Sequence, residues 1–217
     1  MSRQGNPIAV VLLGMPGAGK GTQAQKLAAS GWRHLNVGGL VRAEVAARTT
    51  WGRRAASLMY RGELLPSLEI QDLIRKYLPA GSFPVVVEGY PRRLEEAGTT
   101  AQFCGPDAIE VPVLLEISYA DALARLIKRV ACAQCGRVER TEQGQSCTGC
   151  GGSLVRRNDD DPEAVVRRLQ IYETETAPLI AHYASTGELE AVDASQDESL
   201  VQRDLLRRIS LRTGSGA

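Results

Sequence analysis

The sequence lacks an excess of either charge: its 217 residues include 26 basic and 25 acidic residues, a formal net charge of +1. Nucleic acids and anionic membrane surfaces attract basic proteins, so this balance favours neither as a partner. Long hydrophobic runs are also missing, because the apolar stretch Ile8–Leu13 is far too short to span a bilayer. Internal repeats and low-complexity segments are absent as well. We therefore expect a globular protein that binds neither nucleic acid nor membranes.

The length suits one core domain with small insertions, enough to bury a single apolar core. Lysine is scarce, so nearly all basic residues are arginine, and their positions are more informative than their number. Ile8–Leu13 leads into a glycine-rich stretch without a cleavage site, so we expect a cytoplasmic protein. Residues 1–6 and 213–217 are expected to be loose ends.

Cysteine is infrequent but clustered. Four of the five cysteines form two CxxC pairs with eleven residues between them: Cys132, Cys135, Cys147 and Cys150. Gly136 and Gly151 follow the pairs and permit the tight turns that direct two thiolates at one metal. Disulfides are the alternative, but a cytosolic chain occupies a reducing compartment. The spacing predicts a structural Cys₄ zinc site, whereas Cys104 is expected to be a packed thiol.

One glycine-rich stretch is the most informative feature of the chain. It follows Ile8–Leu13, precedes a helical pattern at 23–29, and reads Gly14-Met15-Pro16-Gly17-Ala18-Gly19-Lys20-Gly21-Thr22. Strand, glycine loop and helix form the context of a P-loop, in which backbone N–H groups and the lysine bind phosphates. Thr22 stands where a hydroxyl would bind Mg²⁺, with Gly21 as an extra residue after Lys20. A tight turn with a surface lysine is the alternative, but we predict a nucleoside triphosphate site.

Apolar runs and helical patterns alternate along the chain. Strands are expected at 8–13, 32–37, 83–88, 111–117 and 189–192. Helices are expected at 23–29, 40–47, 53–61, 66–77, 120–129, 162–171, 178–185 and 198–209. The alternation predicts an α/β fold with a doubly wound parallel sheet. Ligands of such sheets bind beyond the carboxyl ends of the strands, where the glycine loop and Glu88 both fall.

These motifs together resemble the adenylate kinase family, nucleoside monophosphate (NMP) kinases with a zinc-bearing LID. The resemblance runs from about residue 8 to residue 209. The matching segments are residues 14–28, Glu88-Gly89-Tyr90-Pro91-Arg92, residues 125–129, and Arg157-Asn158-Asp159-Asp160 with Arg168-Leu169. The resemblance implies a CORE domain (1–35, 66–129 and 161–217), a helical NMP-binding insertion (36–65) and a LID (130–160). It also implies a monomer that transfers the γ-phosphoryl group of MgATP to AMP, giving two ADP, in nucleotide biosynthesis.

The resemblance also assigns site residues by position. Residues implied to carry the transfer are Lys20, Arg92, Arg129, Arg157 and Arg168. Residues implied to bind ATP are Gly14, Gly17, Ala18, Gly19, Lys20, Gly21, Thr22 and Arg125. Residues implied to bind the acceptor are Val37, Gly38, Arg42, Gly89, Arg92 and Glu96, and those associated with Mg²⁺ are Thr22 and Glu88. Phosphoryl transfer needs such guanidinium groups, which clamp phosphate oxygens bidentately and stay charged. The out-of-register arginines Arg93, Arg156 and Arg167 are expected on the surface.

The sequence departs from the family pattern at three places. Glu88 replaces an aspartate, and Val37-Gly38-Gly39 replaces Thr-Gly-Asp near the acceptor base. Glu96 replaces the glutamine that reads adenine. An ionised Glu96 offers only hydrogen-bond acceptors, which suit the N1–H and N2–H groups of guanine. Alternatively, Glu96 turns away and pairs with Arg61 or Arg93.

Other functions stay open at this point. The acceptor could be GMP or an unusual nucleoside monophosphate instead of AMP. The chain could also be a regulatory module that binds nucleotide and zinc without turnover, although such a module needs no LID arginines. A nucleic-acid-binding zinc ribbon attached to an NTPase is a third possibility, but residues 132–152 balance Arg137 and Arg140 against Glu139 and Glu142 and so lack a basic surface.

Overall fold

The computed structural model describes residues 6–79, 81, 83–105, 107–140, 146–157 and 160–214. Across these residues the central sheet has five strands in the order β2-β3-β1-β4-β8. The strands are β1 (Ile8–Leu13), β2 (Arg33–Asn36), β3 (Val85–Glu88), β4 (Ile109–Glu116) and β8 (Glu190–Asp193). All neighbouring strands are parallel, which confirms the predicted α/β fold. Asn158, Asp159 and the outermost terminal residues lie outside the described residues.

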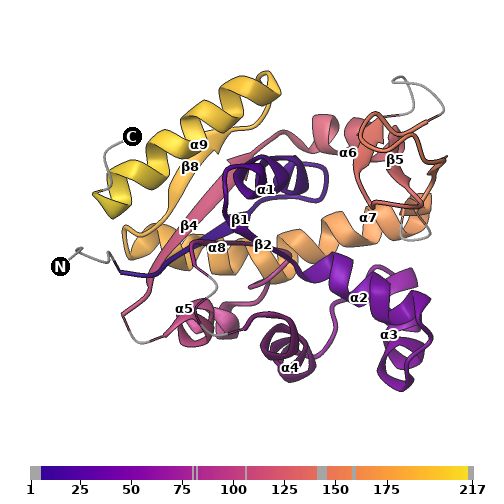
Figure 1. Cartoon of the computed structure of the whole chain (residues 1–217), viewed down its shortest axis with the longest axis horizontal. Helices are drawn as coiled ribbons and strands as arrows, with labels where there is room; N and C mark the ends of the chain where they lie inside the picture. The colour runs from indigo at the N-terminus through magenta and orange to yellow at the C-terminus, as the bar shows by residue number, and fades with distance from the viewer. Residues whose placement is uncertain are drawn as a thin grey trace.

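Alternate residues of β1 face two helical layers. Val10 and Leu12 pack with helices α1 (Lys20–Ala29) and α9 (Glu198–Thr213). Val11 and Leu13 face the opposite layer, where they pack with α8 (Ala177–Ser185). The helices α4 (Ser67–Tyr77) and α5 (Thr99–Cys104) cover the rest of that second face (Figure 1). Strand β1 is therefore buried on both sides, and its carboxyl end is held firmly where the glycine loop begins.

Two small units lie at the end of the molecule away from the termini (Figure 1). One unit consists of α2 (Val37–Ala46) and α3 (Thr50–Tyr60). The other is an antiparallel sheet of β5 (Arg129–Cys132), β6 (Val138–Arg140) and β7 (Leu154–Val155), which follows α6 (Tyr119–Ile127). Both units flank α7 (Pro162–Ile171) (Figure 1). Arg168 and Ile171 of this helix line a cleft together with residues of both units.

The helix α7 continues into α8 through a π turn (Tyr172–Thr176), so the two helices form one long rod. Ala177 N–H donates to the carbonyl of Tyr172, five residues earlier, in place of the usual spacing of four. Pro178 lies in the first turn of α8 and has no N–H to donate, which explains why the regular pattern is interrupted here.

Several boundaries differ from the expected ones for physical reasons. Helix α2 begins at Val37, three residues early, because the Asn36 side chain accepts from Gly39 N–H (2.7 Å) and caps it. The helix expected at 120–129 ends at Ile127, since Arg129 pairs with Arg140 in the small sheet. Within the described residues, no helix is both long and apolar enough to cross a membrane.

A buried carboxylate joins α2 to α4. Glu44 accepts hydrogen bonds from Lys76 Nζ (2.7 Å), Tyr77 Oη (3.1 Å) and Thr49 Oγ1 (2.7 Å). The hydrogen bonds from Lys76 and Thr49 are the main reason that its pKa falls from 4.5 to about 2. A depressed carboxyl pKa contributes stability that is fully present above pH 4.5 and is lost as the pH falls toward 2.

We expect Glu44→Gln to lower the melting temperature by a few degrees at pH 7, because the neutral amide bonds Lys76 less strongly. The difference from the wild type should shrink between pH 4.5 and about 2, as the wild-type carboxylate is protonated. Thermal unfolding followed by circular dichroism across this range measures both effects. Glu173→Gln, at an exposed position, is the control and should leave the melting temperature nearly unchanged. A pH-independent difference would show that the Glu44 charge is not responsible.

Candidate active site

The glycine loop lies between β1 and α1, as its sequence predicts. Gly14 and Gly17 have positive φ angles of 132° and 91°, and an added Cβ would lie 2.6 Å from the carbonyl oxygens of Leu115 and Ala122, respectively. Only glycine fits such approaches. The loop can therefore pass close to the end of β4 and to the first turn of α6.

Lys20 is the first residue of α1, and its side chain turns back over the loop. Its Nζ donates to the carbonyls of Gly14 (2.6 Å) and Met15 (2.9 Å). Burial and the nearby charge of Arg92 lower the lysine pKa to about 7. A cation in a basic, buried position such as this one is stabilised by an anionic ligand.

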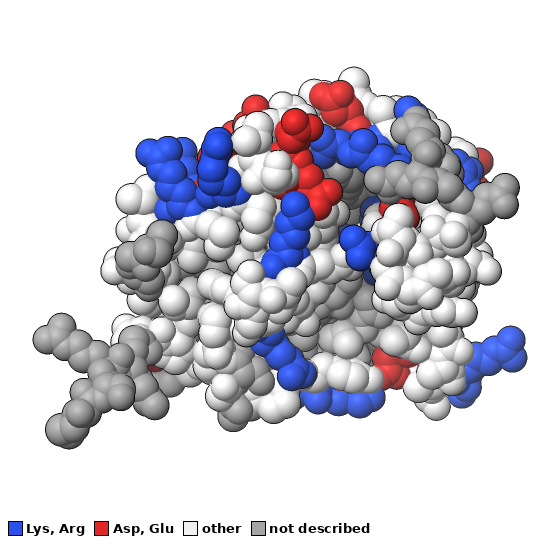
Figure 2. Space-filling view, turned by 45° about the horizontal axis from the view of Figure 1, so that its top comes forward, with Lys and Arg blue, Asp and Glu red and all other residues white. Residues whose placement is uncertain are grey.

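A cleft of about 810 Å³ opens above the loop and contains most of the predicted site residues. Figure 2 shows basic side chains along the hollow on this face of the molecule. All six arginines predicted from the sequence line this cleft: Arg42, Arg92, Arg125, Arg129, Arg157 and Arg168. Ala18 does not line it, because its side chain is buried in the core and its N–H donates to the Met15 carbonyl (3.1 Å).

A smaller cavity of about 100 Å³ adjoins the cleft and shares Gly38, Arg42, Gly89, Arg92 and Arg168 with it. The apolar part of its wall is formed by Val37, Val41, Met59, Leu64, Leu65, Ile70 and Tyr90, and Glu63 and Arg93 also line it. The predicted acceptor residues are thus gathered around one cavity, and Glu96 lies in its wall.

The side chain of Glu96 is buried, with 3% of the residue exposed. Its Oε2 accepts from the backbone N–H groups of Arg92 (2.7 Å) and Arg93 (3.0 Å). The alternative pairing with an arginine side chain is wrong: Arg61 binds Glu63, and the Arg93 guanidinium donates to the Leu65 carbonyl (2.9 Å).

The expectation that Arg93 is a surface residue is also wrong. Its side chain is 23% exposed and lies 3.6 Å from Glu175 on the π turn. Arg93 thereby links Leu65, in the segment between α3 and α4, to the π turn, and these segments are distant in the sequence. Arg156 and Arg167 are exposed, as predicted.

Asp160 is a site residue to which the sequence analysis assigned no role. Arg129 donates to both of its oxygens, with Nε 2.7 Å from Oδ2, and Arg168 donates to Oδ1 at 3.1 Å. The Asp160 side chain is only 1% exposed. The carboxylate therefore fixes two guanidinium groups at the edge of the cleft. Its position beside Arg157 in the matched motif was the available signal.

His34 was missed as well. Its Nε2 lies 3.0 Å from Glu88 Oε1, although the two residues are 54 positions apart. A Cβ added to Gly21 would lie 3.3 Å from Glu88 Oε2, so the glycine after Lys20 leaves room for a side chain longer than aspartate. Glu88 and Thr22 both line the cleft and present a carboxylate and a hydroxyl, which are oxygen ligands of the kind Mg²⁺ takes.

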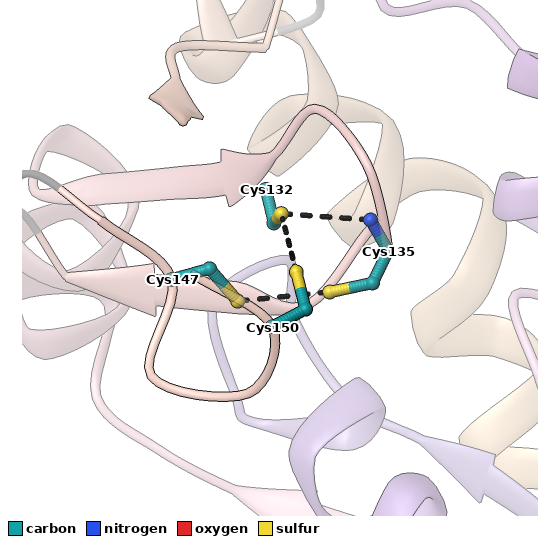
Figure 3. A group of neighbouring side chains, drawn as sticks. All are labelled: Cys132, Cys135, Cys147 and Cys150. Atoms are coloured by element: carbon teal, nitrogen blue, oxygen red, sulfur yellow. Dashed lines mark hydrogen bonds between the residues drawn. The ribbon is translucent and has the colours of Figure 1, made fainter. Parts of the chain in front are cut away.

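The four clustered cysteines converge in the small sheet, as Figure 3 shows. All four sulfur atoms lie within 4.8 Å of one another, with Cys132 and Cys150 3.5 Å apart and Cys135 and Cys147 3.6 Å apart. The backbone N–H groups of Cys135 and Gln134 donate to Cys132 Sγ. These hydrogen bonds stabilise the thiolate and lower the pKa of Cys132 to about 6. This donor set fits a tetrahedral zinc ion. Cys104 is buried and lies outside the cluster, as predicted.

Comparison with known proteins agrees with this geometry. A family model described as adenylate kinase matches residues 12–188. An adenylate kinase of Chlamydia pneumoniae is 36% identical over 204 residues, which cover 92% of this chain and 96% of that protein. An adenylate kinase of Geobacter sp. (strain M21) is 34% identical over 210 residues, 92% of this chain and 98% of that protein. The chain therefore belongs to the adenylate kinase family and is a phosphotransferase.

Proposed function

We propose that the protein transfers the γ-phosphoryl group of MgATP to AMP and so forms two molecules of ADP. The observation that carries this proposal is the cleft in which the glycine loop, Lys20 and the six predicted arginines meet, with a smaller and largely apolar cavity beside it. A protein that only bound ATP would not need so many cations around a second phosphate position. The names of the relatives support AMP as the acceptor.

The residues divide by their place in the cleft. The glycine loop and Lys20 hold the triphosphate, and Arg125 covers the ATP base. Arg42 and Arg92 hold the acceptor phosphate, whose oxygen is already anionic and needs no general base. Arg129, Arg157 and Arg168 neutralise the charge that spreads over the transferring group. Positioning and electrostatic stabilisation therefore account for the reaction.

Two metal ions belong to this proposal. Thr22 and Glu88 would hold Mg²⁺ or its water, and the ion would neutralise phosphate charge. His34 fixes the orientation of Glu88 through the hydrogen bond to Oε1. The four cysteines would hold zinc as a purely structural ion, because four thiolates complete its coordination.

The small units would form the moving parts. We propose residues 36–65 as the NMP-binding insertion, 130–160 as the LID and the rest as the CORE. Gly62, at the end of the insertion, approaches α7 so closely that a Cβ would lie 2.8 Å from the Ala164 carbonyl oxygen. The end of the insertion therefore already lies against α7, and movement of the rest of the insertion over the cleft would exclude water from the transferring phosphoryl group.

A coupled assay that follows ADP formation from ATP tests the proposal, with AMP, GMP, CMP and UMP as acceptors. We expect AMP to be phosphorylated, and Lys20→Ala to give the background rate. A folded, metal-containing protein that transfers phosphate to none of the four would contradict the proposal and favour a regulatory module. Preference for GMP would retain the chemistry and change the acceptor.

The contacts of Asp160 lead to a further prediction. Asp160→Asn should lower kcat about tenfold, because an amide neither neutralises nor orients the guanidinium groups of Arg129 and Arg168 as a carboxylate does. The KM for ATP should change much less, since the glycine loop is untouched. Steady-state kinetics with both substrates separate these effects.

Asp161→Asn is the matched control for this change. Asp161 is exposed and caps α7 by accepting from Glu163 N–H (3.0 Å), a role that asparagine performs equally well. Its kcat should therefore stay near the wild-type value. An Asp160→Asn enzyme with unchanged kcat would show that the carboxylate serves stability alone.

A further inference from the structure

We propose that Glu96 selects the acceptor by requiring a hydrogen-bond donor on the Watson–Crick edge of its base. This inference rests on the proposed function and specifies how the acceptor cavity reads the nucleoside monophosphate. It predicts that the cavity admits 6-aminopurines and 6-oxopurines, and that it rejects a purine whose edge carries only acceptors.

The first step is the fixed position of one carboxylate oxygen. Glu96 ends a short 3-10 turn (Leu94–Glu96), and its Oε2 accepts from Arg92 N–H and Arg93 N–H at 2.7 and 3.0 Å. Two backbone donors converging on one oxygen determine the rotamer of the side chain. The turn that carries Arg92 into the cleft thus also determines which way Glu96 points.

The second step concerns the other oxygen. Oε1 accepts no hydrogen bond from any of the described residues, while the residue forms part of the cavity wall. Oε1 is therefore the oxygen left for a ligand. A carboxylate oxygen accepts and cannot donate, so the ligand must bring the hydrogen.

The third step is the scarcity of other groups that could read a base. The hydroxyl of Tyr90 is taken by Thr99 Oγ1 at 2.6 Å, and Val37 has no hydroxyl to offer. The Arg93 guanidinium donates to the Leu65 carbonyl, and the Glu63 carboxylate accepts from Arg61. Arg42, Arg92 and Arg168 extend into the large cleft, where the phosphates are proposed to lie.

The hydrogen-bonding groups on the Watson–Crick edge of each purine decide whether its nucleotide can bind as the acceptor. Adenine offers the N6 amino group, and hypoxanthine and guanine offer N1–H, so each can donate to Oε1. Unsubstituted purine offers only the N1 lone pair, which would face the carboxylate oxygen and leave both groups unpaired. A buried, unmatched polar pair of this kind weakens binding strongly.

Replacing Glu96 with glutamine should reverse this requirement. The backbone N–H groups of Arg92 and Arg93 need an acceptor, so the amide carbonyl must take the place of Oε2. The amide NH₂ group then faces the cavity and donates where the carboxylate accepted. Purine N1 becomes a matched partner, and the N1–H of hypoxanthine becomes an unmatched one.

The test measures kcat/KM with AMP, IMP and purine riboside 5′-monophosphate for the wild type, Glu96→Gln and Glu95→Gln. Glu95 is the matched control, because it is the adjacent glutamate but is exposed and accepts from Ser67 Oγ at 3.0 Å. We expect the wild type to prefer IMP to the purine ribotide by about tenfold or more. In Glu96→Gln this ratio should fall by about tenfold or more, and in Glu95→Gln it should stay at the wild-type value.

The outcomes separate the two proposals. Failure of the wild type to phosphorylate AMP or any other monophosphate would overturn the proposed function. This inference alone would be overturned if AMP is turned over normally but the IMP-to-purine-ribotide ratio of kcat/KM changes by less than about threefold in Glu96→Gln. An equal change of this ratio in Glu95→Gln would also overturn it. If Glu96→Gln does not fold, as judged from its melting curve, the wild-type preference decides. Equal use of IMP and the purine ribotide would then overturn the inference.

Discussion

Replacing Lys20 with alanine is expected to reduce kcat by far more than tenfold while the protein remains folded. The lysine Nζ lies against the glycine loop, and its pKa of about 7 reflects burial and the proximity of Arg92. An anionic ligand beside the lysine would therefore favour its charged form. Removing the lysine takes away stabilisation of charge on the transferring group, and a tenfold loss alone corresponds to about 1.4 kcal/mol of barrier. Single-turnover kinetics with AMP as acceptor measure the effect.

The same substitution further along α1 provides the control. Lys26 lines the same cleft, but its charge is paired with Glu198 (2.9 Å), so Lys26→Ala should lower kcat far less than Lys20→Ala does. Circular dichroism and the melting temperature should show that both variants are folded. A Lys20→Ala enzyme that keeps more than about a tenth of wild-type kcat would contradict the role given to this residue.

Removing the metal from the cysteine cluster should have the second largest effect. The sulfur atoms lie within 4.8 Å of one another, and without a metal ion the bonds that hold the two CxxC turns together would be lost. Chelation should therefore loosen the sheet of β5, β6 and β7 and lower the melting temperature by about 5 °C or more. The amides of β1 and α1, which lie in the main core, should keep their hydrogen-exchange protection.

Metal analysis and exchange measured by mass spectrometry test this prediction together. Purified protein should contain about one equivalent of zinc, and adding zinc back to the stripped protein should restore protection in the small sheet. A preparation without any metal near one equivalent would remove the basis for a structural site. Loss of protection throughout β1 after chelation would show that the ion supports the whole fold.

The sequence predicted those parts of the fold whose causes lie within a few residues. Helix α7 has the expected bounds because Asp161 caps it and Pro162 occupies its first turn. The parallel sheet follows from short apolar runs separated by helical patterns. Helix α5 was missed, since its sequence (Thr-Thr-Ala-Gln-Phe-Cys) has little apolar periodicity and its stability comes from packing of Cys104 in the core.

For the site, too, the features with local causes were predicted and those that depend on distant residues were not. The residue types that line the cleft followed from motif spacing, because strand ends and the glycine loop meet at one edge of the sheet. The directions in which the side chains point could not be predicted from motif spacing. Asp160 meets an arginine 31 positions away and His34 a carboxylate 54 positions away, so only the assembled fold brings them together. The orientation of Glu96 likewise depends on the turn at Arg92 and Arg93.

The π turn between α7 and α8 determines which way the side chains of α7 point relative to those of α8. Each residue of an α-helix advances the rotation by about 100°, and the one additional residue in this turn displaces the two halves by about that angle. Arg168 can therefore face the cleft while Leu179, on the same rod, is fully buried beneath the sheet. In an uninterrupted α-helix of the same length, Arg168 and Leu179 would point to nearly the same side of the rod, about 20° apart. The π turn is therefore what allows one rod to contribute a side chain to the cleft and another to the core.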